Sequence, residues 1–310
     1  MALLSVDGLR TRYVMRGRVL NAVDGVSLDV DLGETVGLVG ESGCGKSTLG
    51  KTILRLLDPV EGSIRIRGNE ISDLGQYALL PFRRRMQMVF QDPYGSLNPR
   101  QTVATLLTTP LKVHGVRGRT ERRRRVRDIV SRVGLPVEAL DRYPHEFSGG
   151  QRQRIGIARA LILEPDLMVC DEPVSALDLS IQAQILNLLV DLKRDLGLSY
   201  LFISHDLSVV RYFADRVFVM YLGRIVESAG HAALWRQPRH PYTRALFAAV
   251  PRPDPDRLRG PVALRGELSA ADAGGCRFRA RCPDAVSRCA SEDPPLRTVA
   301  PGHLAACHLA

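Results

Sequence analysis

A glycine-rich turn between an apolar strand and a helix is the feature that most constrains this chain. Residues 35–48 read TVGLVGESGCGKST and fit the phosphate-loop pattern G-x-x-x-x-G-K-[ST]. Glycines let such a backbone curl until successive N–H groups point inward, and the following helix adds its positive dipole end to the same anion site. The pattern therefore predicts a site for a nucleoside triphosphate such as ATP. Its predicted binding residues are Gly40, Glu41, Ser42, Gly43, Cys44, Gly45, Lys46, Ser47 and Thr48.

Two side chains at the start of the predicted helix have separate tasks. Lys46 is expected to neutralise the β- and γ-phosphates as a point charge, and the Ser47 hydroxyl to complete the coordination of Mg²⁺. Tyr13 lies well upstream, among alternating apolar residues that predict half-buried antiparallel strands. Its ring is a candidate to stack on an adenine, and ordinary packing within a strand is the alternative.

Acidic and imidazole side chains follow two further predicted strands. Residues 167–172, LMVCDE, form an apolar run that predicts a buried parallel strand and ends in two carboxylates. Asp171 is expected to bind Mg²⁺ through water, and Glu172 to accept a proton from the water that attacks the phosphate. His205 follows the next strand, at the kind of strand end where ligand sites gather, and is expected to contact the γ-phosphate. A loop start and a structural histidine are the alternatives.

Two more features contribute to a predicted nucleotide site. Gln91 leaves a strand predicted for residues 86–90, where its amide can reach Mg²⁺ or the attacking water; capping a turn is the alternative. A second glycine turn precedes another predicted helix and consists of Ser148, Gly149, Gly150 and Gln151. Because one nucleotide needs only one cradle, this second anion site suggests that the γ-phosphate of an ATP held elsewhere, such as on another copy, docks here.

Size and charge limit the classes of protein. A chain of 310 residues can bury one large core with an appendage, or two domains. No run approaches the ~18 uninterrupted apolar residues that span a bilayer, and the first residues lack a signal segment. We therefore expect a cytoplasmic protein whose membrane role needs other chains. The net charge of +10 suits nucleic acid, anionic lipid or nucleotide and does not choose between them.

The ordered motifs together are typical of one family. The loop, Gln91, the SGGQ turn, the acid pair, a turn at 175–178 and His205 follow one another as in the ATPase subunits of ABC transporters, which the chain resembles. The resemblance implies an α/β P-loop NTPase fold of ABC type in residues 1–235, with a parallel core sheet, an N-terminal antiparallel β subdomain and a helical subdomain at about 92–163. It also implies a sandwich dimer in which the SGGQ turn of one subunit closes over ATP held by the other.

The same resemblance implies a role for several side chains. Glu172 is implied as the catalytic base, His205 as the γ-phosphate switch, Gln91 as the link to the membrane subunits, and Asp178 as a contact across the dimer. Phe147 departs from the Leu that the family usually has there. The change keeps the position apolar.

Two further stretches narrow the resemblance to one branch. Residues 91–100, QDPYGSLNPR, and 240–246, HPYTRAL, are similar to the oligopeptide, dipeptide and nickel uptake branch, and other segments are similar to the second of its two paired ATPases. The resemblance implies peptide import at the cytoplasmic face of the membrane, with a related ATPase in a heterodimer, two transmembrane permease subunits and an extracytoplasmic solute-binding protein. Nickel or another small solute is the alternative cargo.

A different class of ATPase shares these site motifs. ABC-type ATPases of DNA repair are the distant alternative, but they split their two halves with a long coiled coil or a zinc insert. Only about 100 residues separate Gly45 from Ser148, and no heptad run lies between them. We therefore expect no nucleic-acid partner.

The end of the chain, residues 236–310, is expected to hold a separate appendage behind a Pro-, Gly- and Ala-rich linker at 251–275. It carries four crowded cysteines, Cys276, Cys282, Cys289 and Cys307. Two disulfides, a Cys₄ zinc site or an iron–sulfur cluster would tie it together, and gaps wider than C-x₂₋₄-C disfavour zinc. The resemblance implies a [4Fe–4S] cluster, with Zn²⁺ as the alternative. Several arginines are expected to offset its negative charge: Arg277, Arg279, Arg281 and Arg288.

Overall fold

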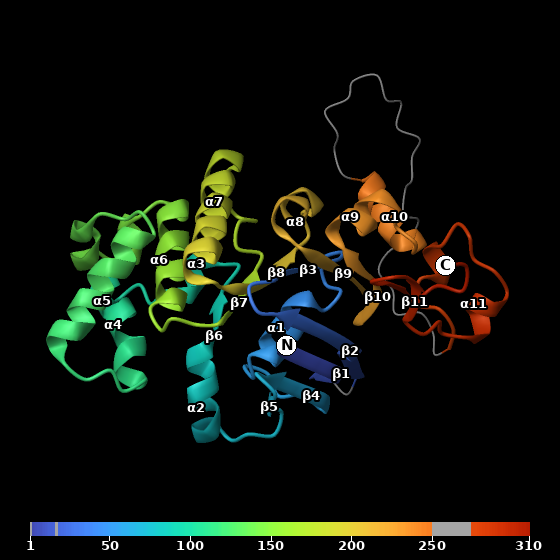
Figure 1. The fold of residues 1–310 in the computed structure, drawn as a ribbon, viewed down its shortest axis with the longest axis horizontal. Coiled ribbons are helices and arrows are strands. Elements are labelled where there is room, and N and C mark those ends of the chain that lie inside the picture. Colours follow the sequence, from blue (N-terminus) through green and yellow to red (C-terminus); the bar gives the residue numbers. More distant parts are fainter. Residues whose placement is uncertain (1, 16–17, 250–273) are drawn as a thin grey trace.

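The computed structural model describes residues 2–15, 18–249 and 274–310 (Figure 1). The predicted linker at 251–275 lies almost entirely outside the described residues. Two sheets, a group of helices beside them and a small C-terminal region make up the described chain.

The larger sheet has eight strands in the order β11-β12-β10-β9-β3-β8-β7-β6. Five of them, β6 to β9 and β3, run parallel, while β10, β12 and β11 add antiparallel strands at one edge. The continuous apolar runs of β3, β7 and β8 are buried throughout, as expected for strands covered on both faces. Their bounds are β3 (Thr35–Val39), β6 (Met86–Val89), β7 (Leu167–Asp171), β8 (Ser199–Ser204), β9 (Arg216–Tyr221), β10 (Arg224–Gly230), β11 (Arg297–Ala300) and β12 (His303–Ala305).

The smaller sheet is antiparallel, as the alternating pattern near the N-terminus predicts. Its order is β2-β1-β4-β5. Helix α1 (Lys46–Ile53) contacts β1 and β2 of this sheet and β7 and β8 of the other, so it fills the space between the two sheets. The strands are β1 (Ala2–Met15), β2 (Arg18–Asp31), β4 (Glu61–Ile66) and β5 (Asn69–Glu70).

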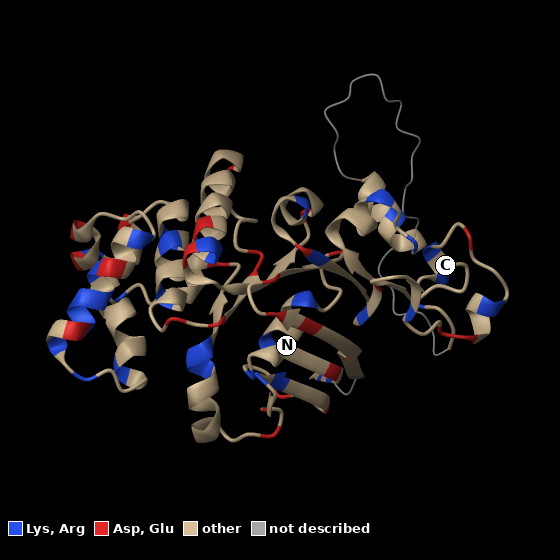
Figure 2. Cartoon of the chain, in the orientation of Figure 1, with Lys and Arg blue, Asp and Glu red and all other residues tan. Residues whose placement is uncertain are grey.

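A helical lobe follows β6 in the chain and lies to one side of the sheets (Figure 1). Helix α5 (Arg119–Arg132) carries basic and acidic bands, which Figure 2 shows. Arg124 forms exposed ion pairs there with Glu121 and Asp128 of the same helix. The lobe and its neighbours are α2 (Gln76–Arg85), α3 (Pro93–Ser96), α4 (Val103–Val113), α5 (Arg119–Arg132), η1 (Val137–Asp141), η2 (Pro144–Glu146), α6 (Gly149–Leu161) and α7 (Leu179–Leu196).

The C-terminal region is built onto the main sheet, which corrects the expectation of a separate appendage. Strand β12 pairs with β10, with Leu304 opposite Ser228, and the fully buried Phe278 joins the main core. Pairing in this way covers an edge strand that would otherwise present unpaired backbone groups. The remaining elements are α8 (Leu207–Phe213), α9 (His231–Arg236), α10 (Pro241–Ala248), η3 (Arg279–Arg281) and α11 (Arg288–Ser291).

Among the described helices, none combines the length and the apolar character that crossing a bilayer requires.

Candidate active site

The glycine loop between β3 and α1 has a backbone that only glycine fits at two positions. Gly40 and Gly45 have φ of 155° and 109°. A Cβ on Gly40 would lie 2.2 Å from the carbonyl oxygen of Met220, and one on Gly45 would lie 2.1 Å from that of Ala22. The predicted loop therefore depends on these two glycines for both its curvature and its close packing.

Lys46 points back into this loop. Its side chain is only 4% exposed, and its Nζ donates hydrogen bonds to the carbonyl oxygens of Gly40 at 2.8 Å and Glu41 at 2.9 Å. The positive charge of Lys46 is thus held beside the loop, where it would interact with a phosphate bound by the backbone N–H groups of the loop. The Tyr13 hydroxyl lies 3.4 Å from Thr48 Oγ1 with its ring partly exposed, so the aromatic predicted to stack on a base does lie beside this helix.

Ser47 and Asp171 meet although 124 residues separate them in the chain. The Ser47 hydroxyl donates to Asp171 Oδ1 at 2.8 Å, between the start of α1 and the end of β7. Burial raises the pKa of Asp171, while the hydrogen bond from Ser47 and the nearby charge of Lys51 oppose that shift. Two hard oxygen donors beside a phosphate loop suit Mg²⁺.

Glu172 is held by two other predicted site residues. Gln91 Nε2 donates to its Oε2 at 2.7 Å, and His205 Nδ1 lies 3.0 Å from its Oε1. The Glu172 backbone has φ of 46°, a left-handed conformation that is rare for a non-glycine residue, and its N–H donates to the Ile203 carbonyl at 2.9 Å. Such local strain is concentrated at functional sites. The carboxylate is therefore held in one place by three strand ends.

The second glycine turn is an exposed cap. Ser148 accepts a hydrogen bond from the Gln151 N–H, and the Gln151 side chain accepts one from the Ser148 N–H, which is a capping box at the start of α6. Gly150 packs so closely that a Cβ would lie 2.5 Å from Ile181. Asp178, before α7, is exposed. Within the described residues, no hydrogen bond or ion pair joins this turn or Asp178 to Lys46.

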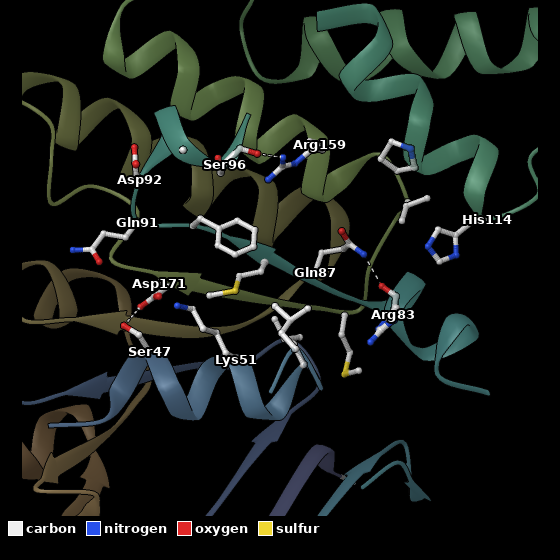
Figure 3. A pocket seen from close by; sticks show the side chains of 18 residues that line it. Ser47, Lys51, Arg83, Gln87, Gln91, Asp92, Ser96, His114, Arg159 and Asp171 are labelled. Carbon is white, nitrogen blue, oxygen red and sulfur yellow. Dashed lines mark hydrogen bonds between the residues drawn. The ribbon is translucent and has the colours of Figure 1, made fainter. Parts of the chain in front are cut away.

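A groove of about 800 Å³ opens beside the site, between α1 and the helical lobe (Figure 3). Ser47, Gln91 and Asp171 line one end of it, and His114 lies at the other end. Arg159 lines the wall of the groove formed by the lobe and donates a hydrogen bond to the Ser96 carbonyl there (Figure 3). The groove therefore connects Gln91 with the surface of the lobe.

Sequence reasoning missed two residues that contact the phosphate loop. Tyr242 and Arg281 both reach Glu41, from positions 201 and 240 residues further along the chain. No spacing rule links them to the loop. The only signals were that Tyr242 lies in the HPYTRAL stretch and that Arg281 precedes Cys282.

The four C-terminal cysteines are free and line one small cavity together with His308. Among the described side chains, no three of the four Sγ atoms lie within 4.8 Å of one another. His303 is engaged elsewhere, since its Nε2 lies 2.7 Å from the buried Glu227. Three of the arginines expected to balance a cluster are paired instead, Arg277 with Asp24, Arg281 with Glu41 and Arg288 with Glu292.

Comparison with known families covers both parts of the chain. Residues 23–175 match the family described as ABC transporter. Residues 226–289 match the family described as oligopeptide/dipeptide transporter, C-terminal region.

Whole proteins and solved structures are also similar. The oligopeptide transport ATP-binding protein AppF of Bacillus subtilis is 51% identical over 295 residues, covering 94% of this chain and 90% of that protein. A Brucella ovis protein whose name describes it as a peptide import ATP-binding protein is 53% identical over 307 residues. The match covers 98% of this chain and 97% of that protein. A dimeric ATP-binding cassette, MJ0796, solved in a post-hydrolysis state with ADP and phosphate, has a TM-score of 0.68 at 30% identity and covers 74% of this chain and 98% of its own.

Proposed function

Because the chain belongs to the ABC transporter family and is an ATP-hydrolysing subunit of it, we propose that it powers the import of peptides through membrane-embedded permease subunits. One observation carries the cargo class: residues 226–289 match the C-terminal region of oligopeptide and dipeptide transporters. The 51% identity to an oligopeptide transport protein along almost the whole chain supports the same conclusion.

In the proposed mechanism, ATP lies on the loop between β3 and α1. Lys46 would neutralise the β- and γ-phosphates, and Ser47 and Asp171 would hold Mg²⁺, which would supply positive charge to the phosphates. Glu172 orients the attacking water and accepts its proton, because it is the carboxylate that Gln91 and His205 hold at 2.7 and 3.0 Å. His205 is in turn placed to sense the γ-phosphate.

The active form is proposed to be a dimer. Ser148 and Asp178 are exposed and make no bond to their own phosphate loop in the described chain. This supports the proposal that they contact ATP bound by a partner subunit. The solved dimer of a similar cassette supports this arrangement. We infer a related but unlike ATPase as the partner.

Contact with the membrane is proposed to run through the groove of Figure 3. A permease segment seated there would touch Gln91, which in turn touches Glu172. Such a chain of contacts gives the permease a route to the hydrolytic carboxylate. The protein would then be peripheral, at the cytoplasmic face, with a solute-binding protein delivering peptide on the opposite side.

For the four cysteines we propose a [4Fe–4S] cluster, with a Cys₄ zinc site as the alternative. Tetrahedral zinc with Zn–S bonds of about 2.3 Å brings all four sulfurs to about 3.8 Å of one another. The gaps between these cysteines in the sequence are all wider than C-x₂₋₄-C, which favours the cluster over zinc. Protein purified without oxygen should be brown and hold about four irons per chain. Colourless protein with one tightly bound zinc would favour the alternative.

The cargo is tested by assembling the chain with its partner ATPase, permeases and solute-binding protein in vesicles. Short peptides should raise ATP hydrolysis and enter the vesicles, and neither should occur with the Glu172→Gln variant. Stimulation by nickel salts in place of peptides would contradict the peptide proposal and leave the ATPase assignment intact.

A further inference from the structure

Glu41, the residue after the first glycine of the phosphate loop, forms hydrogen bonds with residues near the C-terminal end of the chain. The guanidinium of Arg281 makes a two-pronged ion pair with its carboxylate, with Nη1 2.8 Å from Oε2 and Nη2 3.0 Å from Oε1. The Tyr242 hydroxyl accepts a hydrogen bond from the Glu41 backbone N–H at 2.8 Å. Both the side chain and the backbone of Glu41 are therefore fixed from outside the loop.

These contacts are well shielded from water. The side chains of Arg281 and Glu41 are 8% and 21% exposed, and that of Tyr242 is fully buried. Paired guanidinium–carboxylate bonds in such a setting are stronger and more directional than neutral ones. The hydrogen bonds that Arg281 donates to the Glu41 carboxylate raise the pKa of Arg281 above its ordinary value.

The same short segment reaches the other end of the loop. Arg277 donates to the carbonyl of Leu222, in the turn between β9 and β10. In that turn the Gly223 N–H donates to the Cys44 carbonyl at 2.8 Å. Residues 277–281 thus contact the loop directly at Glu41 and through one intervening turn at Cys44.

Phe278 gives this segment a rigid backing. Its ring is fully buried, with its centroid 5.3 Å from that of Tyr221 and 5.5 Å from that of Tyr242. A packed aromatic cluster holds its side chains in defined places. Tyr242 belongs to this cluster and Arg281 follows Phe278 by three residues, so neither can move far without disturbing the core. The hydrogen bonds from this region to Glu41 therefore start from side chains whose positions are fixed by packing.

We infer that Arg281 and Tyr242 are positioning residues for the phosphate loop, and that they act on ATP binding through Glu41. The Glu41 carbonyl also accepts a hydrogen bond from Lys46 Nζ at 2.9 Å. Holding Glu41 in place therefore also helps to hold Lys46, the side chain proposed to neutralise the phosphates. A loop held ready in this way loses less freedom when ATP binds, and binds it more tightly. Neither side chain needs to touch the nucleotide.

The test measures the dissociation constant of a fluorescent ATP analogue for the full chain. Arg281→Met and Tyr242→Phe should each weaken binding, Arg281→Met by about tenfold, the scale of one charge-assisted hydrogen bond. Turnover at saturating ATP in the assembled transporter should stay within about twofold while KM rises, because the chemistry at Glu172 is untouched. The matched control is Arg194→Met, which breaks exposed ion pairs of Arg194 with Asp191 and Asp195 on α7 and should change neither quantity.

A double-mutant cycle separates this role from general stability. In a Glu41→Ala background, adding Arg281→Met should cause little further loss of affinity, because the carboxylate that Arg281 binds is already gone. Tyr242→Phe removes a single oxygen atom, so it keeps the test valid if Arg281→Met unfolds the C-terminal region. Unchanged affinity in Tyr242→Phe and in folded Arg281→Met, or an Arg281→Met effect that persists in full without Glu41, would overturn the inference.

Discussion

The two glycine turns of the chain precede helices in the same way, yet they are built differently. The first turn uses positive φ at Gly40 and Gly45 and lies against the carbonyls of Ala22 and Met220. The second has ordinary φ at both glycines, and its Ser148 stands exposed at the start of α6. One turn is enclosed and the other faces outward.

Their surroundings differ in the same sense. The first turn has Lys46 folded over it, Asp171 and Glu172 beside it, and Arg281 behind it. In the second turn, the side chains of Ser148 and Gln151 each accept a hydrogen bond from the other residue's backbone N–H. This difference supports the proposal that the first turn holds the phosphates of one nucleotide, while the second turn covers a nucleotide held by a partner subunit.

Removing the carboxylate beside the first turn should have the largest effect. Glu172→Gln keeps the shape of the site and the hydrogen-bonding partners but cannot accept a proton, so turnover should fall at least ~10²-fold with ATP affinity retained. Steady-state hydrolysis and equilibrium binding measure the two quantities. The control is Glu138→Gln at an exposed position, which should be silent. Near-normal turnover in Glu172→Gln would place the base elsewhere.

Lys46→Ala should come next, because it removes the cation of the first turn. ATP affinity should fall about 10- to 100-fold, which corresponds to losing hydrogen bonds to a charged group. Isothermal titration of the variant with ATP and Mg²⁺ measures it, with exposed Lys112→Ala as the control. If ATP affinity did not change, the loop would not be the phosphate site.

Ser148→Arg sharpens the comparison from the side of the second turn. The isolated variant should bind ATP within about twofold of wild type, since the turn does not reach its own loop, while hydrolysis by the assembled complex should fall about tenfold or more. Binding and hydrolysis are measured on the same preparation. A matching loss of ATP affinity in the isolated chain would show that the turn serves its own loop.

The smallest predicted effect concerns His240, which caps α10, the helix that carries Tyr242. Burial lowers the pKa of His240 to about 4, and its Nδ1 accepts from the Tyr242 N–H. A depressed histidine pKa gives stability that is complete above the ordinary pKa and is lost as pH falls toward 4. The wild-type free energy of unfolding should drop about 1 kcal/mol more between pH 7.5 and 5.5 than that of His240→Asn, which keeps the cap and cannot titrate. Parallel denaturant curves for the two proteins would contradict this.

Motif spacing was enough to predict which polar side chains meet at the strand ends of the candidate site. The contacts of Ser47 with Asp171 and of Glu172 with Gln91 and His205 form because parallel strands end at the same edge of a sheet, and strands are readable from apolar runs. The resemblance to ABC transporter ATPases and the coarse fold were predicted and are confirmed.

The supporting contacts could not be predicted in this way. Arg281 meets Glu41 across 240 residues through a segment with no clear period, and strands β11 and β12 are too short and polar to signal a sheet edge. Both depend on how the C-terminal region packs around Phe278, which is a tertiary outcome. Whether Tyr13 stacks on a base stays a prediction.

Mixing two inactive variants tests the central claim most directly, which is that each nucleotide is bound by the first turn of one subunit and covered by the second turn of another. Lys46→Ala and Ser148→Arg proteins should each hydrolyse ATP poorly alone, at concentrations where wild-type activity rises with protein concentration. Their mixture should recover activity, because a mixed pair contains one site with an intact Lys46 and an intact Ser148. If sedimentation showed that the two variants pair and the mixture were still as inactive as its parts, the account would be contradicted and each chain would complete its own site.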